Sequence, residues 1–90
     1  MICDYCGLQR GHTKDHLITR NQARRNPKAA YHRKDAKFIV RACLRCNVNK
    51  GTSLRVPPSH EHLIPELEAI TGGVYAIYDG TSATLRSVVK

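Results

Sequence analysis

The sequence has no long apolar run and no internal repeat. Only Met1 and Ile2 precede the first cysteine, and no stretch of about 20 apolar residues follows, so we expect neither a signal peptide nor a transmembrane helix. Low-complexity segments are absent too, so the organisation of the chain has to be inferred from local patterns. These absences predict a cytosolic protein that does not associate with membranes.

Acidic residues are scarce as well, and this imbalance indicates a polyanionic partner. There are 7 Asp and Glu against 15 Lys and Arg, which gives a formal net charge of +8. The excess is concentrated in one stretch that contains a single acid, Asp35, and the basic residues Arg20, Arg24, Arg25, Lys28, Arg33, Lys34 and Lys37. Such a stretch is typical of a nucleic-acid contact, although a solvated basic face explains it equally well.

Chain length and cysteine spacing together predict a bound metal. The 90 residues are enough for one domain with a modest core, and so short a chain often needs a metal or a crosslink to stay folded. The cysteines form two pairs, Cys3-x-x-Cys6 and Cys43-x-x-Cys46. Since the cytosol keeps thiols reduced, these pairs predict four thiolates on one structural Zn²⁺ rather than a disulfide framework. We therefore expect residues 1–90 to form a single domain that is a monomer or a weak dimer.

Local patterns predict an α+β fold organised around this zinc. The expected elements follow from apolar alternation, helix caps and turn residues. They are, in chain order, a strand at 13–19, a helix at 28–37 after Asn26 and Pro27, a strand at 38–42, a helix from 43 or 44 to Gly51, a helix that has Pro65 in its first turn and ends at Gly72, and a hairpin with strands at 74–78 and 83–89. Residues 52–90 are expected to form a C-terminal helix and hairpin, and the hairpin is expected to add core surface and no chemistry.

A combination of motifs around the cysteines resembles a known family. Asp15 and His16 stand as an Asp-His pair between the two cysteine pairs, and the second pair is followed by Asn47-x-x-Lys50-Gly. This combination resembles the HNH endonucleases, which have the ββα-metal fold. The resemblance covers residues 3–51 and implies a small zinc-stabilised ββα-metal unit, with the rest of the chain as a C-terminal extension. It also implies a nuclease that hydrolyses the phosphodiester backbone of nucleic acid, with DNA favoured over RNA.

The resemblance implies a role for each matching residue. Asp15 and Asn47 correspond to ligands of a catalytic divalent cation, Mg²⁺ or Mn²⁺, and His16 corresponds to the general base that activates water. The chemistry asks for these residue types independently. An imidazole with a pKa of about 6.5 can accept a proton at neutral pH, and a hard cation held by oxygen ligands offsets the charge on the phosphoryl group.

Basic side chains near these residues are candidates for substrate contacts. A helix that starts at the second cysteine pair places Asn47 and Lys50 one turn apart on a face beside the zinc ligands, where Lys50 could meet a phosphate. Arg20, expected on the preceding catalytic strand, could clamp a phosphate oxygen. The neighbouring Arg24 and Arg25 are also assigned to substrate binding.

One member of the family motif is missing. The middle Asn of the HNH name, which usually braces the loop that carries the catalytic His, has no counterpart at Lys37 or Phe38. Asp35 and His32 are nearby candidates to replace it. The gap keeps a second hypothesis open, in which the protein is a non-catalytic, zinc-containing module that binds nucleic acid. A zinc-stabilised protein-interaction module is a weaker third hypothesis.

The remaining polar and aromatic residues have simpler explanations. His60 and His62 are expected to lie in a solvated helix entry rather than in a second metal site. His12 is expected to be a surface residue or to contact a phosphate. Tyr75 and Tyr78 are expected to pack the hairpin rather than to stack on bases.

Overall fold

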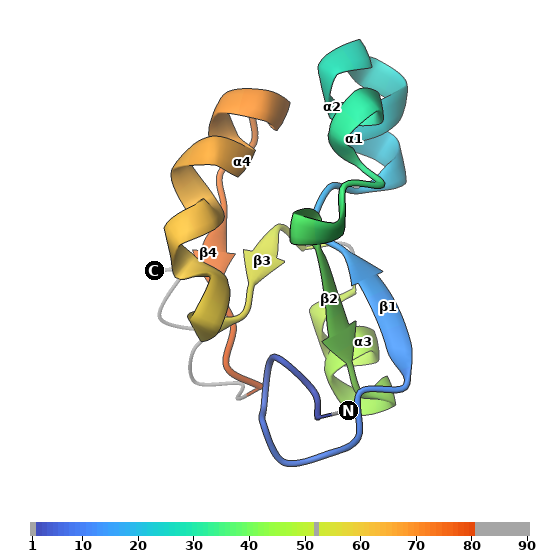
Figure 1. Cartoon of the computed structure of the whole chain (residues 1–90), viewed down its shortest axis with the longest axis vertical. Helices are drawn as coiled ribbons and strands as arrows, with labels where there is room; N and C mark the ends of the chain where they lie inside the picture. The colour runs from blue at the N-terminus through green and yellow to red at the C-terminus, as the bar shows by residue number, and fades with distance from the viewer. Residues whose placement is uncertain (1, 52, 81–90) are drawn as a thin grey trace.

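The structure is a computed structural model that describes residues 2–51 and 53–80. Within these residues lie two two-stranded sheets, four α-helices and two 3₁₀ helices (Figure 1). In chain order they are β1 (Thr13–His16), α1 (Arg20–Arg25), α2 (Pro27–His32), η1 (Ala36–Phe38), β2 (Ile39–Ala42), α3 (Leu44–Lys50), β3 (Arg55–Val56), η2 (Pro58–Leu63), α4 (Ile64–Thr71) and β4 (Ala76–Ile77). The predicted α+β class is confirmed, whereas the ββα-metal fold itself stays a prediction.

The first sheet and the helix after it form a strand, strand, helix unit. β1 and β2 pair antiparallel, with His16 opposite Ile39. Cys43 follows β2 with extended backbone and caps α3, because its Sγ accepts a hydrogen bond from the backbone N–H of Cys46. Gly51, at a φ of 57°, ends α3 where the sequence predicts its end.

The strand expected at 13–19 is shorter than predicted, because a helix that the sequence patterns do not predict follows it. β1 ends at His16, and α1 begins at Arg20. The cause is a capping box, in which the Thr19 side chain accepts from the backbone N–H of Gln22 and the Gln22 side chain accepts from the backbone N–H of Thr19. Arg20 therefore lies on a helix and not on the strand that carries His16, which corrects the prediction.

The next helix starts where predicted but ends early. Asn26 caps α2 by accepting from a backbone N–H of its first turn, and Pro27 is its first residue. α2 ends at His32 and does not reach Lys37, because Asp35 caps the separate 3₁₀ turn η1. The two short helices α1 and α2 consequently stand together beyond one end of the β1–β2 sheet (Figure 1).

The second sheet belongs to the C-terminal part of the chain. β3 pairs in parallel with β4, and β4 falls within the strand expected at 74–78. Neither β3 nor a parallel pairing is predicted by the sequence patterns. α4 connects the two strands, has Pro65 in its first turn and ends at Gly72, as predicted. The second strand of the expected hairpin, at 83–89, lies outside the described residues.

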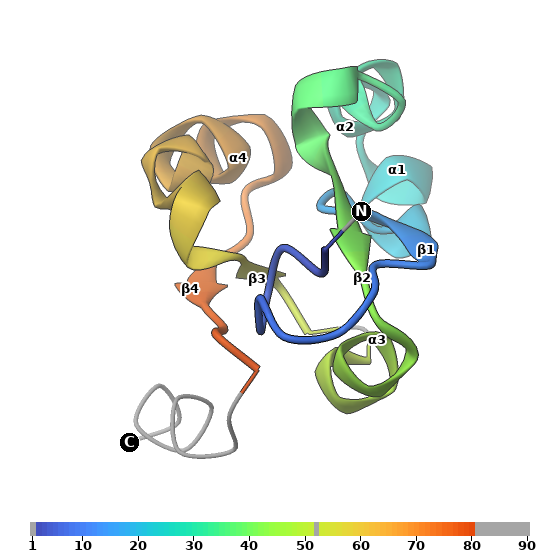
Figure 2. The same cartoon turned by 60° about the horizontal axis from the view of Figure 1, so that its bottom comes forward.

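One apolar core joins the two parts of the fold. Leu17, Ile18 and Phe38 from the N-terminal half are no more than 2% exposed, as are Leu67 and Tyr78 from the C-terminal half, and all belong to one cluster. Figure 2 shows α3 with the β1–β2 sheet on one side of this core and α4 with the β3–β4 sheet on the other. Within the described residues, no helix has the length and apolar character needed to span a bilayer.

Candidate functional site

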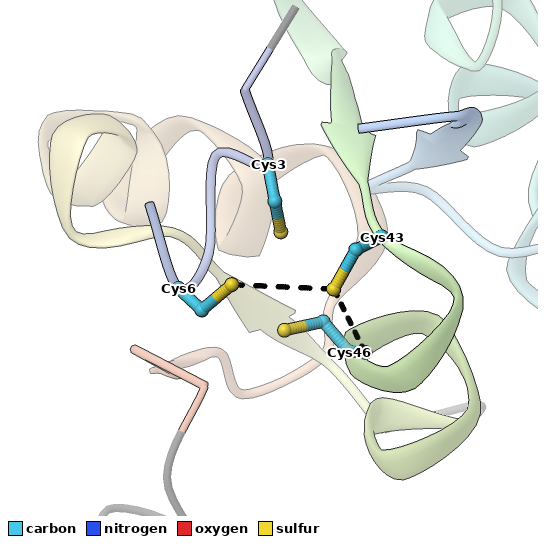
Figure 3. A group of neighbouring side chains, drawn as sticks. All are labelled: Cys3, Cys6, Cys43 and Cys46. Carbon is cyan, nitrogen blue, oxygen red and sulfur yellow. Dashed lines mark hydrogen bonds between the residues drawn. The ribbon is translucent and has the colours of Figure 1, made fainter. Parts of the chain in front are cut away.

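The four cysteines meet where the N-terminal loop faces the end of β2 and the start of α3 (Figure 3). The Sγ atoms of Cys3, Cys6, Cys43 and Cys46 all lie within 4.8 Å of one another, and those of Cys6 and Cys43 are 4.0 Å apart. A tetrahedral zinc with Zn–S bonds of about 2.3 Å holds its sulfurs about 3.8 Å apart. All four thiols are free of disulfide bonds. The cluster is therefore compatible with the structural zinc that the sequence predicts.

Each cysteine pair sits in a tight turn that is closed by the backbone. In the first turn, Gly7 has a φ of 69°, and its N–H donates to the Cys3 carbonyl at 3.0 Å. In the second turn, the N–H of Asn47 donates to the Cys43 carbonyl at 2.9 Å as α3 begins. The chain itself thus turns both pairs of thiols toward one point.

The thiols differ in how readily they ionise. Burial opposes ionisation of Cys6, but hydrogen bonds from the backbone of Leu8 and Gln9 outweigh it and lower the pKa of its thiol to about 6. Burial raises the pKa of the Cys46 thiol, and a hydrogen bond with Cys43 adds to that rise. Because zinc binds thiolates, loading the cluster should release protons from it.

Residues near the end of the described chain cover the cluster. A Cβ at Gly80 would lie 2.6 Å from the Cβ of Cys6 and 3.5 Å from the Sγ of Cys46, so a larger residue does not fit there. Tyr78 is 1% exposed, and its ring centre lies 5.8 Å from that of Tyr5. The C-terminal segment therefore packs against the metal-binding loop, a contact that sequence patterns do not indicate.

The β1–α3 interface brings together polar residues from distant parts of the chain. Asn47 Nδ2 donates to Thr13 Oγ1 at 3.3 Å, and Lys50 Nζ lies 3.3 Å from Asp15 Oδ2. Thr13 and Asp15 are alternate residues of one strand and share a face, while Asn47 and Lys50 are one helical turn apart. Asn47 and Lys50 lie on one side of α3, as their spacing predicts. Both contact β1, the strand that carries Asp15.

Asp15 lies at the centre of a buried polar network. Its residue is 9% exposed, and its carboxylate accepts a hydrogen bond from the Tyr5 hydroxyl and pairs with Lys50, which is 4% exposed. Burial raises the pKa of the Tyr5 hydroxyl, and the negative charge of Asp15 raises it further, so Tyr5 remains a donor. Lys50, predicted to contact a phosphate, here faces the protein interior. Tyr5 carries no sequence signal for this role.

His16 follows Asp15 in β1, so its side chain points to the other face of the strand. The side chain is partly buried. Burial and the nearby Arg33 lower the pKa of its imidazole below 6.5, and the Asp15 carboxylate opposes this shift only in part. The ring is therefore neutral at neutral pH, in the form that can accept a proton.

The loop after His16 is braced by residues other than those expected. The backbone N–H of Leu17 donates to the Phe38 carbonyl at 2.9 Å, and the hydroxyl of Tyr75 donates to the Leu17 carbonyl at 2.7 Å. Phe38 occupies the region where the family has its middle Asn. His32 packs edge-on against the Phe38 ring, while Asp35 caps η1, so these support the loop only indirectly.

The remaining candidate residues are placed on the surface. Arg20 is exposed at the start of α1, and Arg24 and Arg25 are exposed at its end. His60 and His62 lie in η2 with their rings 6.3 Å apart and stacked, at the solvent-facing entry to α4, as predicted. Within the described residues, the cysteine cluster is the only group of three or more His, Cys, Asp or Glu side chains arranged to hold a metal.

Comparison with known proteins identifies no relative of this chain. No family model, no curated protein and no solved structure matches it. The resemblance of residues 3–51 to HNH endonucleases therefore stays a prediction, which the geometry around the cysteine cluster has to support.

Proposed function

We propose that this protein is a metal-dependent nuclease that hydrolyses phosphodiester bonds in nucleic acid, with DNA favoured over RNA. The observation that carries the proposal is that β1, which bears Asp15 and His16, packs against α3, which bears Asn47 and starts at the four-cysteine cluster. The formal charge of +8 suits a polyanionic substrate.

His16 is the proposed general base. Its imidazole is neutral at neutral pH, so it can take a proton from the water that attacks phosphorus. It lies on a strand that is hydrogen-bonded to β2, and the loop behind it is fixed by Tyr75. A base held in this way keeps its orientation during the reaction.

Asp15 and Asn47 are the proposed ligands of a catalytic Mg²⁺ or Mn²⁺. The Asp15 carboxylate and the Asn47 side-chain carbonyl are hard oxygen donors, and the Asn47 amide nitrogen is turned to Thr13. Such a cation, when bound, offsets negative charge on the phosphoryl oxygens. Lys50 pairs with the Asp15 carboxylate and so orients it. The four-cysteine zinc would be structural, since four thiolates leave no open coordination position.

A second candidate function is a zinc-containing module that binds nucleic acid without cutting it. The observation that favours it is the burial of Asp15, whose carboxylate is already engaged by Tyr5 and Lys50. A paired, buried carboxylate is a common structural feature and does not require a cation. Both candidates predict binding, so cleavage separates them.

Cleavage of supercoiled plasmid and of single-stranded RNA in the presence of Mg²⁺ or Mn²⁺ tests the proposal. His16→Ala should lower the cleavage rate about a hundredfold to ten-thousandfold while zinc content and nucleic-acid affinity stay close to wild type. His62→Ala, which removes an exposed histidine of η2, is the matched control and should cleave normally. If the wild type cuts neither substrate, or if the His16→Ala variant is active, the nuclease proposal fails. The non-catalytic binding module then becomes the preferred function.

A further inference from the structure

We propose that the arginine-lined cavity between α1, with Arg33 beside it, and the C-terminal end of α4 binds a phosphate-bearing nucleotide of the substrate strand. The identity of the ligand rests on the proposed function, whereas the existence of the site does not. A third of the lining residues, namely Leu54, Thr71, Gly72 and Gly73, belong to the C-terminal extension, which lies outside the segment that resembles the HNH family.

The cavity is a defined space between two parts of the fold. Its volume is about 900 Å³, within the range of roughly 300–1,000 Å³ of pockets that hold small ligands. One wall is α1 together with Arg33, and the opposite wall is the end of α4 with Gly72 and Gly73. Asn26 ties the walls to each other, because its Nδ2 donates to the Ile70 carbonyl at 2.9 Å. Figure 1 shows α1 and α2 standing opposite the end of α4.

The charge that lines the cavity is positive and is not compensated within it. Four of the lining residues are arginines, namely Arg20, Arg24, Arg25 and Arg33, and no acidic side chain of the described residues lines it. The ion pairs found within the described residues, Lys37 with Glu66 and Lys50 with Asp15, both use lysine. Guanidinium groups bind phosphate in bidentate fashion, so a phosphate is the ligand that this lining fits best.

Buried donors at the cavity also lack acceptors. Within the described residues, Arg33 Nε and Gln22 Nε2 are buried without a hydrogen-bond partner. The carbonyl oxygen of the same Gln22 side chain is engaged by the N–H of Thr19 and the hydroxyl of Tyr75, which fixes the amide. Buried donors without acceptors are rare in native proteins. A ligand rich in oxygen acceptors, such as a nucleotide, would supply what is missing.

The cavity lies next to the proposed general base. β1 ends at His16, and the rim of the cavity begins at Thr19, three residues later. Arg20, which lines the cavity and begins α1, follows His16 by four residues. A strand whose scissile phosphodiester lies at His16 would therefore place an adjoining nucleotide in the cavity.

Two charge-matched double substitutions test the proposal. They are made in the His16→Ala background to prevent cleavage, and binding of a fluorescein-labelled DNA oligonucleotide is followed by anisotropy. Arg24→Gln with Arg33→Gln should weaken binding about tenfold or more, because hydrogen bonds to phosphate are lost. Lys28→Gln with Lys34→Gln removes the same charge from exposed positions outside the cavity and should have a much smaller effect. Equal losses in the two variants would overturn the proposal and leave a diffuse basic surface.

A competition experiment on the His16→Ala protein, with no further substitution, identifies the ligand. Unlabelled compounds are tested for their ability to displace the labelled oligonucleotide. Thymidine 5′-monophosphate should displace it, whereas thymidine should not, because the lining recognises phosphate. Displacement by inorganic phosphate as effective as that by the mononucleotide would overturn the nucleotide assignment. Cleavage by the wild type without cavity-dependent binding would refute only this inference. Cavity-dependent binding without any cleavage would refute the nuclease proposal and preserve the site.

Discussion

Two charged regions of this molecule differ in how their charges are balanced. At the β1–α3 interface, Asp15, Lys50 and Tyr5 satisfy one another in the interior. At the α1–α4 cavity, four arginines gather without an acidic partner among the described lining residues. In the first region opposite charges offset each other within the protein, whereas the positive charges of the second region are not offset by its lining.

This difference indicates what each region contributes. A buried ion pair is costly to break, because removing one partner leaves the other charged group buried and alone. Exposed like charges contribute little to folding and are free to act on a ligand. Substitutions at the β1–α3 interface should therefore change stability first, and substitutions at the cavity should change binding first.

The largest effect is expected from loss of the zinc predicted at the four-cysteine cluster. Cys46→Ser should abolish tight zinc binding and cooperative folding, since structural zinc in small domains contributes about 10–16 kcal/mol of apparent binding free energy. Circular dichroism and zinc analysis measure this. Val48→Ser, on an exposed position of the same helix, is the control and should remain folded with one zinc. A zinc-free Cys46→Ser protein that still unfolds cooperatively would show that the metal is not needed.

The next largest effect is expected at the buried ion pair. Lys50→Met should lower the free energy of unfolding by about 3–5 kcal/mol, because Asp15 is left charged in the interior. Lys14→Met removes an exposed lysine of β1 and should cost far less. Adding Asp15→Asn to Lys50→Met should recover part of the loss, as measured by urea unfolding. A Lys50→Met protein as stable as wild type would contradict the claim that this region is internally balanced.

A smaller loss is expected at the brace behind His16. Tyr75→Phe removes the hydroxyl that donates to the Leu17 carbonyl, which should cost about 1–3 kcal/mol of stability. If the brace positions His16, kcat of cleavage should fall while KM changes little. Tyr31→Phe, at a residue that is 82% exposed, is the matched control. Unchanged stability and kcat in Tyr75→Phe would remove Tyr75 from this role.

The smallest effect on stability is expected in the cavity. Arg24→Gln and Arg25→Gln should each change the free energy of unfolding by no more than about 0.5 kcal/mol, since both side chains are exposed. The same substitutions should each flatten the dependence of DNA affinity on salt by about one unit of slope. If these variants lose folding stability but the salt dependence of DNA affinity is unchanged, the cavity arginines contribute to folding and not to binding.

Local sequence signals predicted the elements that caps and turns define. Asn26 and Pro27 mark the start of α2, Gly51 marks the end of α3, and Gly72 marks the end of α4, each through its own backbone preference. The capping box of Thr19 and Gln22 starts α1 just after the apolar residues Leu17 and Ile18, so the strand expected at 13–19 ends early. The pairing of β3 with β4 has no local signal, because each strand has only two residues and the contact is not local.

In the candidate site, too, features set by local sequence could be predicted, whereas features set by tertiary packing could not. Cysteine spacing is enough to predict the metal cluster, because a C-x-x-C turn presents two thiols to one ion whatever the rest of the fold does. The partners of Asp15 depend on tertiary packing, so Tyr5 could not be identified from sequence. The same holds for Tyr75, which lies 58 residues from the carbonyl to which it donates.

Gly80 packs directly on Cys6 and Cys46, and Cys46 is fully buried, so a chelator should reach the Cys46 sulfur only after this part of the chain has moved away. Tyr78, two residues earlier, is buried and donates through its backbone to the Val56 carbonyl, so lifting also disrupts the β3–β4 pairing. Release of the ion is then coupled to a local unfolding event, whose frequency sets the rate of exchange. We therefore expect zinc to dissociate slowly from this site, even if its equilibrium affinity is ordinary.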